Sequence, residues 1–317
     1  MIQIVARSEP MREAMRLADR VATTDANVLI TGESGVGKDA LALHIHSRSN
    51  RASESFVKID CATLPSGLLE AELFGYERGA FTGATDAKPG RLEAAHRGTL
   101  VLDEIAYLPI DAQAKLLRVI ETKEFERLGG RNNVTVDARL IALTNVDLDD
   151  AVSRKRFRED LYYRLNVMHI RVPALRERDA DLAELASGFV TAYSEKHGRE
   201  VTGLSAAALA VLAAYDFPGN VRELANTIER AVIVSSSTQV QPQDLPESIR
   251  AAAEAGRRRS APQTLSEVEE EYVQQILTAT NGNKTEAARI LGISRKNLYE
   301  RIARSGRQEV DESEVGE

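Results

Sequence analysis

A length of 317 residues is about twice that of a typical domain, so the sequence predicts two or three domains. The net charge of −7 argues against a protein that coats nucleic acid over its whole surface, and no apolar run approaches the roughly 20 residues of a membrane span. Charged residues throughout positions 1–20 leave no secretory signal, and the single cysteine, Cys61, cannot form an internal disulfide. We therefore expect a soluble cytoplasmic protein without a zinc site, in which Cys61 is a small buried apolar residue.

The first part of the chain alternates short β-type runs with amphipathic helical stretches. One such helix is predicted at Asp111 to Glu121. The predicted strands are Val28 to Thr31, Phe56 to Ile59, Thr99 to Leu102 and Arg139 to Thr144. This alternation predicts an α/β domain over residues 1–172, with a parallel sheet and helices on both of its faces.

The segment after the first strand, residues 32–38, fits the phosphate-binding pattern G-x-x-x-x-G-K and precedes a predicted helix. Its glycines let backbone N–H groups surround phosphates, and Lys38 reaches the terminal phosphates of a nucleotide. The next position usually carries a Ser or Thr for magnesium but is Asp39 here, which leaves that magnesium contact open. The predicted nucleotide-binding residues are Gly32, Glu33, Ser34, Gly35, Val36, Gly37, Lys38 and Asp39.

A second motif, residues 100–104, is an apolar run that ends in two acids. At the carboxyl end of a parallel strand, these acids face the same crevice as the phosphate loop. Asp103 is the predicted magnesium ligand, and Glu104 is the predicted general base that activates water. Together the two motifs predict a nucleoside triphosphatase that works with Mg²⁺.

The pattern changes after Pro173 to helical periodicity alone. It predicts an α-helical domain at residues 173–240 with helices at Asp179 to His197, Ser205 to Tyr215 and Asn220 to Ser235. The next stretch is polar, contains three prolines and a run of three arginines, and is predicted to be a linker. The remaining predicted parts are this linker at 241–263, a last helical unit at 264–306 and an acidic tail at 307–317.

The last helical unit is basic, with seven basic residues against two acidic ones between positions 284 and 307. Ala288, Gly292 and Leu298 have the spacing of two helices that cross closely at a tight turn, as in a helix-turn-helix. A hairpin used only for dimerisation is the alternative. The second helix is predicted to begin after a capping serine and to contact the major groove of DNA through Ser294, Arg295, Lys296, Asn297, Tyr299 and Arg301.

Several segments resemble the sigma-54-dependent activators, or bacterial enhancer-binding proteins, of the AAA+ superfamily. Four of them are similar to the family's GESGTGK, GTLFLDE, FREDLYYRL and PGNVREL, namely residues 32–38, 98–104, 157–165 and 218–224. Residues 79–84 reproduce without change the GAFTGA loop that distinguishes these activators from other AAA+ proteins. The resemblance covers about residues 2–304, and the C-terminal unit is similar to the Fis-type helix-turn-helix.

This resemblance implies an ATPase that binds upstream DNA as a homohexameric ring and converts the closed complex of sigma-54 RNA polymerase into an open one. ATP and Mg²⁺ are the implied cofactors. Arg158 and Arg164 are the implied arginine fingers, which reach the γ-phosphate of a neighbouring subunit. Asn145, after Thr144, is the implied phosphate sensor, and Arg222 is the implied sensor arginine of the helical lid. The implied contact with sigma-54 is made by Gly79, Ala80, Phe81, Thr82, Gly83 and Ala84.

Several alternatives stay open. Phe81 could be packed in the core, and Arg158 and Arg164 could merely pair with acids on their own helix. A DNA-binding repressor with a weak ATPase, or an AAA+ replication initiator, would share most motifs but would lack a working GAFTGA loop. Asp60 stands where the family often has Asn, and an ionised Asp cannot donate a hydrogen bond to Glu104.

The ATPase pattern begins almost at Met1, where most family members carry a regulatory domain. Two explanations are open. Either a separate regulatory protein controls this one in trans, or the sequence is a piece of a longer chain.

Overall fold

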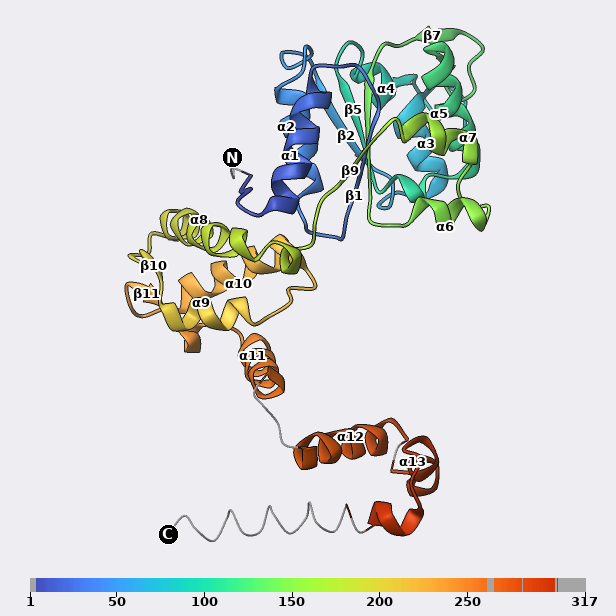
Figure 1. Cartoon of the computed structure of the whole chain (residues 1–317). Helices are drawn as coiled ribbons and strands as arrows, with labels where there is room; N and C mark the ends of the chain where they lie inside the picture. The colour runs from blue at the N-terminus through green and yellow to red at the C-terminus, as the bar shows by residue number, and fades with distance from the viewer. Residues whose placement is uncertain (1–3, 261–264, 281, 300, 302–317) are drawn as a thin grey trace. The chain divides into compact units, whose positions relative to one another are not determined.

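The computed structural model describes residues 4–260, 265–280, 282–299 and 301. The chain divides into two compact units, residues 1–250 and 251–317 (Figure 1). The predicted acidic tail and the end of the predicted linker lie outside the described residues.

A five-stranded sheet forms the centre of the first unit. Its strands run in the order β2-β5-β8-β1-β9, and each neighbouring pair is parallel. Because all strands point the same way, their carboxyl ends meet at one edge, where Asp60 lies opposite Asp103 and Thr31 opposite Thr144. The strands are β1 (Val28–Thr31), β2 (Phe56–Asp60), β5 (Thr99–Asp103), β8 (Arg139–Thr144) and β9 (Met168–Arg171).

Successive strand residues point to opposite faces of the sheet, so each face has its own apolar core. On β5, Leu100 and Leu102 belong to one core and Val101 to the other, and all three are fully buried. The first face is covered by α3 (Ser66–Phe74), α4 (Arg91–Ala94), α5 (Ile110–Thr122), α6 (Leu148–Ser153) and α7 (Glu159–Leu165). The second face is covered by α1 (Glu9–Ala22) and α2 (Lys38–Ser47), which lie on the other side of the sheet in Figure 1. The predicted parallel sheet with helices on both faces is confirmed.

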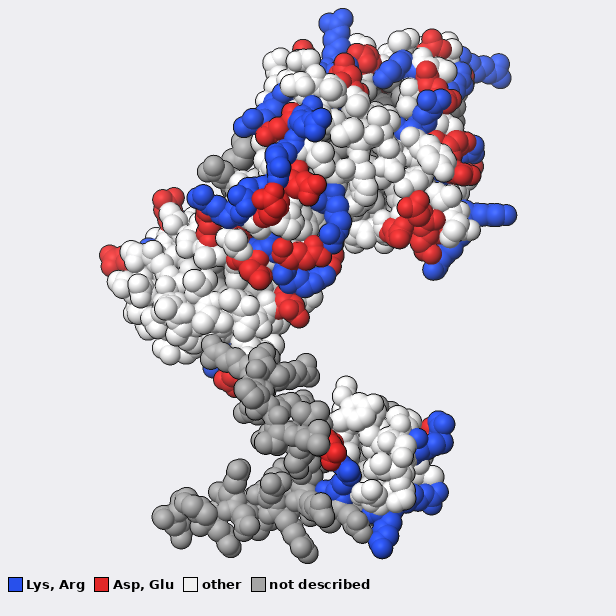
Figure 2. Space-filling model, in the orientation of Figure 1, with Lys and Arg blue, Asp and Glu red and all other residues white. Residues whose placement is uncertain are grey.

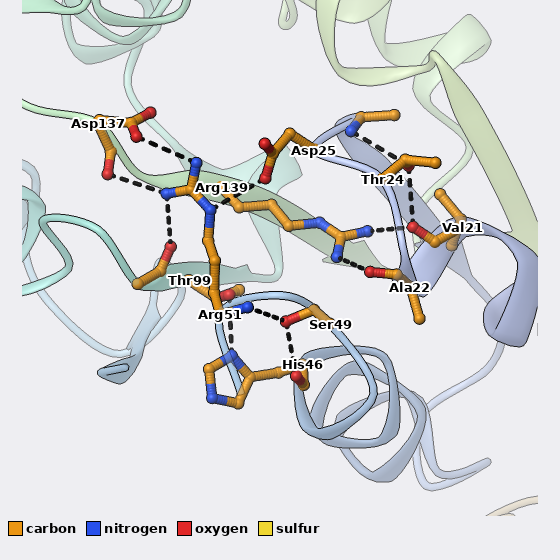
Figure 3. A network of polar contacts seen from close by, with 12 residues as sticks. Val21, Ala22, Thr24, Asp25, His46, Ser49, Arg51, Thr99, Asp137 and Arg139 are labelled. Atoms are coloured by element: carbon orange, nitrogen blue, oxygen red, sulfur yellow. Dashed lines mark hydrogen bonds and ion pairs between the residues drawn. The ribbon is translucent and has the colours of Figure 1, made fainter. Parts of the chain in front are cut away.

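A polar network fixes the amino ends of the strands (Figure 3). Arg139, at the start of β8, is only 2% exposed and donates hydrogen bonds to the carbonyl oxygens of Val21 and Ala22, at 2.8 and 2.9 Å. These carbonyls lie at the carboxyl end of α1, and that of Val21 also accepts the backbone N–H and the hydroxyl of Thr24, at 3.0 and 2.9 Å. Nearby, the guanidinium of Arg51 bridges the carboxylates of Asp25 and Asp137.

Two short hairpins extend from the α/β domain. The first pairs β3 (Gly75–Tyr76) with β4 (Lys88–Pro89), and the second pairs β6 (Glu124–Glu126) with β7 (Asn133–Thr135). They are held together by Arg127, which lies 2.7 Å from a carboxylate oxygen of Glu93 and 3.0 Å from one of Glu77.

The helical domain packs α8 (Asp179–His197), α9 (Ala206–Ala213) and α10 (Asn220–Val234) around a core of its own. We call this domain the lid. The three predicted helices are confirmed, but the lid also contains a small parallel sheet of β10 (Gly203–Leu204) and β11 (Gln239–Val240). Two-residue strands have no detectable alternation, which is why the sequence pattern did not indicate them.

The linker predicted at residues 241–263 is wrong at its beginning. Leu245 and Ile249 are 2% exposed and belong to the core of the lid, and α11 (Glu247–Ser260) begins between them. The polar composition of the stretch concealed two isolated apolar residues, Leu245 before the helix and Ile249 in its first turn.

The second unit contains α12 (Leu265–Ala279), α13 (Lys284–Ile290) and a further helical stretch at 295–299. Ala288 and Leu298 are 4% and 0% exposed, and Gly292 has φ 68° at the turn between the last two helices. The hydroxyl of Ser294 accepts the backbone N–H of Asn297, so the predicted cap is present. Within the described residues, no helix is both long enough and apolar enough to cross a membrane.

Candidate functional site

A cavity of about 260 Å³ lies between the phosphate loop, the end of β5 and the lid. It brings together most of the residues predicted for nucleotide binding and hydrolysis, and it adds apolar side chains that the sequence did not single out. The added residues are Phe189, Val221 and Ala225, all from the lid. The predicted residues in its lining are Ser34, Gly35, Gly37, Lys38, Asp39, Asp103, Glu104 and Arg222.

The phosphate loop is held by close backbone packing. A Cβ atom at Gly32 would lie 2.6 Å from the carbonyl oxygen of Val172, and one at Gly35 would lie 2.4 Å from that of Gly219. Both glycines also have positive φ angles, 152° and 79°, which L side chains rarely adopt. Glycine is therefore required twice over at these positions, for conformation and for space.

Lys38 lies at the start of α2 with only 8% of the residue exposed. Its ammonium donates to the carbonyl oxygens of Gly32 at 2.8 Å and Glu33 at 3.1 Å, and it lies 3.9 Å from the Glu104 carboxylate. Burial lowers the pKa of Lys38, against the opposing effect of the nearby carboxylates. A cation held by carbonyl groups at the mouth of the loop is suited to exchange them for phosphate oxygens.

The two acids at the end of β5 have different surroundings. Asp103 accepts the backbone N–H of Glu104 through Oδ1 at 3.0 Å. Glu104 has the left-handed backbone angles φ 50° and ψ 50°, which are uncommon for a residue with a side chain. Its carboxylate accepts the backbone N–H of Asn145 at 3.2 Å, so the predicted base contacts the predicted sensor directly.

Asp60, the departure from the family's asparagine, points toward its own turn. Its carboxylate accepts the backbone N–H of Ala62 at 2.8 Å. The next residue, Cys61, is 2% exposed as predicted and donates its backbone N–H to the carbonyl oxygen of Asp103. Burial, and then the carboxylates of the crevice, raise the pKa of the Cys61 thiol to about 12.

Lys58, on β2, was not predicted as a site residue. Its ammonium lies 2.7 Å from Asp103 Oδ2 and 2.5 Å from Asp39 Oδ1. Both carboxylates therefore face one point at the end of the crevice, as ligands of a divalent cation would. Carboxylate oxygens are the donors that Mg²⁺ prefers, so Asp103 and Asp39 fit the magnesium that the motifs imply.

The lid reaches the phosphate loop through several polar contacts. Arg222 donates to the hydroxyl of Ser34 at 3.0 Å, so the predicted sensor arginine faces the crevice. The amide of Asn220 donates to the Glu33 carboxylate at 3.0 Å and to the Ser34 carbonyl at 3.1 Å. Arg178, which is 3% exposed, donates to the carbonyl oxygen of buried Val36 at 2.8 Å.

Glu33 accepts hydrogen bonds from two residues of the lid, Arg176 and Asn220. Arg176 holds both of its carboxylate oxygens, at 2.5 and 3.0 Å. The hydrogen bonds from Arg176 and then Asn220 lower the pKa of Glu33 to about 2. A movement of the lid would therefore be transmitted to the phosphate loop.

The GAFTGA loop, residues 79–84, projects from the first hairpin. Phe81 is 41% exposed, and its ring meets the edge of Tyr76 with centroids 5.0 Å apart, so Phe81 is not a core residue. Thr82 is exposed, whereas Ala84 is buried and closes the loop through hydrogen bonds with Gly79 and Phe81. A Cβ atom at Gly79 or Gly83 would meet nothing within 4 Å.

Comparison with protein families agrees with this geometry. The model of the sigma-54 interaction domain matches residues 4–171, more than half of the chain. The chain belongs to the family of sigma-54-dependent transcriptional activators. An AAA+ ATPase lid domain matches residues 176–262, and a bacterial regulatory protein of the Fis family matches residues 264–304. The sigma-54 interaction domain is thus of the AAA+ ATPase type and is joined to a DNA-binding helix-turn-helix.

Curated relatives and solved structures give the same assignment. The chain is 43% identical over 311 residues to the regulatory protein AtoC of Escherichia coli (strain K12), covering 96% of this chain and 68% of AtoC. It is 45% identical over 305 residues to the nitrogen fixation protein AnfA of Azotobacter vinelandii, covering 96% of this chain but only 57% of AnfA. Crystal structures of NtrX from Brucella abortus in complex with ATP and with ADP are 34% identical and have TM-scores of 0.71 and 0.73. They match 96% of this chain, which covers 69% and 70% of the NtrX chains.

The two predicted arginine fingers of the sigma-54 interaction domain are exposed and paired with acids. Arg158, at the start of α7, contacts Asp160 at 2.7 Å, which is the pairing that the sequence left open. Arg164 contacts Glu121 of α5 at 3.1 Å rather than an acid on its own helix. The side chains of Arg158 and Arg164 are 39% and 60% exposed, so both are accessible to a neighbouring molecule.

In the Fis-type unit, five of the residues predicted to bind DNA are exposed. They are Ser294, Arg295, Lys296, Asn297 and Tyr299. Arg301 differs, because it forms an ion pair with Glu269 of α12 and a hydrogen bond with Asn297 at 3.3 Å. The ammonium of Lys284 lies over the ring of Tyr299, 4.8 Å from its centroid. Figure 2 shows Lys and Arg side chains standing out on the described surface of this unit.

Sequence reasoning missed several residues of the site, among them Lys58, Arg178, Asn220 and Phe189. Asn220 and Arg178 lie in or beside recognised segments, and their signal was a polar residue at the predicted start of a lid helix. Lys58 and Phe189 carry no motif. Their positions follow only from the pairing of β2 with β5 and from the packing of the lid.

Proposed function

We propose that this chain is an ATP-hydrolysing activator that converts the closed promoter complex of sigma-54 RNA polymerase into an open one. Residues 79–84 engage sigma-54, and the C-terminal unit binds upstream DNA. Hydrolysis in the crevice changes the position of the loop, and this change is transmitted to the polymerase.

The chemistry of the crevice supports ATP hydrolysis. Lys38 and the backbone N–H groups of the phosphate loop bind the phosphates, and Arg222 contacts them from the lid. Asp103 and Asp39 would hold Mg²⁺, which would supply positive charge to neutralise the phosphates. Glu104 accepts the proton of the attacking water, and its contact with Asn145 aligns the carboxylate in the crevice.

One observation carries the activator function: a loop with an exposed aromatic anchor on the same unit as the crevice. Phe81 is 41% exposed, and the loop glycines have open space around them. Large exposed apolar side chains at a flexible tip are suited to grip a partner. A repressor or a replication initiator would have no use for such a loop.

The test separates chemistry from coupling with Thr82→Ala. Thr82 lies outside the lining of the crevice, so phosphate release should proceed at the wild-type rate. Promoter melting, measured by permanganate footprinting with sigma-54 polymerase, should be lost. Thr85→Ala is the matched control, because Thr85 is an exposed threonine just outside the loop and should retain both activities. Normal melting by Thr82→Ala would remove the activator function and leave a DNA-binding AAA+ ATPase of another target.

We also propose that the active form is a homohexameric ring in which Arg158 and Arg164 act on the nucleotide of a neighbouring subunit. A finger that acts in trans requires a head-to-tail interface, and such an interface forms a ring when the rotation between subunits closes. Both arginines are exposed, and each pairs with an acid that it can exchange for phosphate. Arginine fingers raise the rate of hydrolysis roughly 10³–10⁵-fold, which corresponds to about 4–7 kcal/mol of activation free energy. An exposed ion pair contributes only about 0–1 kcal/mol to the free energy of unfolding.

Mixing subunits tests the trans arrangement. Lys38→Ala and Arg158→Ala proteins should each be inactive alone. When the two proteins are mixed, the Arg158→Ala subunit supplies an intact Lys38 and its Lys38→Ala neighbour supplies an intact Arg158. Part of the ATPase activity should then be restored. The absence of any restoration, with both variants folded and assembled, would contradict a role of Arg158 in trans.

Arg295 and Lys296 are proposed to have different roles in DNA binding. Arg295 begins the second helix, whose N-terminal residues read bases in helix-turn-helix proteins, whereas Lys296 contacts phosphate. Arg295→Ala should weaken specific binding by about 1–3 kcal/mol with little change on random DNA. Lys296→Ala should weaken both and reduce the salt slope by about one. Equal losses on specific and random DNA for Arg295→Ala, measured by fluorescence anisotropy, would refute the base-reading role.

A further inference from the structure

Lys58 links two carboxylates of the crevice that belong to different elements. Lys58 lies on β2, at the edge of the sheet, while Asp39 is in the first turn of α2 and Asp103 ends β5. The distances from its ammonium are 2.5 Å to Asp39 and 2.7 Å to Asp103. One side chain therefore ties the strand of the metal ligand to the helix that follows the phosphate loop.

Both oxygens of the Asp103 carboxylate are engaged in this arrangement. Oδ1 accepts the N–H of Glu104 at 3.0 Å, and Oδ2 accepts the ammonium of Lys58. Mg²⁺ binds carboxylate oxygens at about 2.1 Å, so a magnesium ion on the same oxygen would lie only a few ångströms from the ammonium. Two cations at that separation repel each other strongly.

Lys58 is able to leave, because its side chain is 38% exposed and that of Asp103 is 16% exposed. Lysine is a flexible point charge that does not need a fixed fork geometry. Lys38 is placed differently, since its ammonium contacts the carbonyl groups of Gly32 and Glu33 and lies 3.9 Å from the Glu104 carboxylate.

We propose that Lys58 is the built-in counter-cation of Asp39 and Asp103 and competes with the divalent cation for Asp103. Lys58 is a positioning residue, which holds the two carboxylates together until the divalent cation takes Asp103 from it. The inference rests on the proposed ATPase function, in which Lys58 sets the magnesium concentration at which the crevice becomes competent.

The test measures Mn²⁺ binding to the full chain without nucleotide, from the electron paramagnetic resonance signal of the free ion. Mn²⁺ shares the preference of Mg²⁺ for carboxylate oxygens. Lys58→Met and Lys58→Gln remove the competing charge, so the dissociation constant should fall about tenfold. Lys58→Arg keeps the charge and should stay near wild type. Lys115→Met is the matched control, because Lys115 pairs with Glu70 at 2.6 Å, with similar exposures of 43% and 22%, and does not line the crevice.

An unchanged or higher dissociation constant for both uncharged variants, including no measurable binding to any of the proteins, would overturn the proposal. Thermal unfolding gives a second measurement. Without divalent cations Lys58→Met should unfold at a lower temperature than wild type, because two carboxylates are left facing each other, and Mn²⁺ should narrow the difference. An equal loss of stability with and without Mn²⁺ would indicate a merely structural role and would also overturn it. Neither measurement uses ATP or a promoter, so a failure of the proposed function would be seen separately.

Discussion

Residues 32–38 and residues 79–84 are both glycine-rich loops, yet their glycines have very different surroundings. In the phosphate loop, Cβ atoms at Gly32 and Gly35 would lie 2.6 and 2.4 Å from backbone oxygens. In the GAFTGA loop, Cβ atoms at Gly79 and Gly83 would meet nothing within 4 Å, although their φ angles of 82° and 104° are also positive. Gly32 and Gly35 are needed for space as well as for backbone conformation, whereas Gly37 (φ 105°, nothing within 4 Å) and the glycines of the GAFTGA loop are needed only for backbone conformation.

This difference matches two kinds of task. A phosphate cradle has to be preorganised, because a group displaced by one ångström loses much of its contribution to rate. A loop that grips a partner has to change position while it stays attached. The GAFTGA loop is nevertheless packed against the second hairpin at one point, since a Cβ atom at Gly129 would lie 2.9 Å from Ala80.

The largest effects on nucleotide binding and hydrolysis are expected from substitutions of Lys38, in the phosphate loop, and of Glu104, the proposed base. Lys38→Ala should weaken nucleotide binding by roughly 2–5 kcal/mol, because a buried charge partner of the phosphates is removed. Glu104→Ala should bind nucleotide no more weakly than wild type but should hydrolyse it about 10²–10⁴-fold more slowly. Fluorescent nucleotide titration and phosphate release measure the two steps. Wild-type turnover by Glu104→Ala would reject Glu104 as the base.

A pair of matched substitutions sharpens the comparison. Gly35→Ala combines a positive φ with a clash against the Gly219 carbonyl, so it should lower the free energy of unfolding by about 2–4 kcal/mol. It should also weaken nucleotide binding, because the clash with Gly219 would push the lid away from the phosphate loop, and both of them line the cavity. Gly83→Ala should lower the free energy of unfolding by only about 1–2 kcal/mol, because the positive φ angle is unfavourable for alanine but the added Cβ atom meets no neighbour.

Denaturant unfolding and nucleotide titration of both variants check this pair. The ATPase activity of Gly83→Ala should equal that of wild type, and that of Gly35→Ala should fall. Equal destabilisation by the two substitutions would mean that packing does not distinguish the loops.

The fold could be predicted well from the sequence where the pattern was long or the motif strong. The strands at Val28–Thr31 and Arg139–Thr144 and the helix at Asp179–His197 have the predicted bounds. Short elements were missed because two residues cannot show a period, as with β10 and β11. The predicted linker was partly wrong because Leu245 and Ile249 are isolated apolar residues in a polar stretch, and only the core of the lid gives them a role.

Some residues of the site could likewise be predicted from the sequence, and others could not. The phosphate loop, Asp103 and Glu104 were predictable because they form contiguous motifs. The pairing of Arg164 with Glu121, and of Arg301 with Glu269, depends on which helices pack together, and no local pattern indicates it. Whether Arg301 releases Glu269 to contact DNA stays a prediction. The role of Lys58 required the register between two strands, which a single sequence does not contain.

The burial of Cys61 makes the protein convenient for labelling. Its thiol is 2% exposed and its pKa is about 12, so almost none of it is thiolate at neutral pH. Because it is the single cysteine of the chain, two cysteines introduced on the surface would react with maleimide dyes nearly alone. A fluorophore pair on the loop and the lid could then follow their separation during turnover without removal of the native thiol.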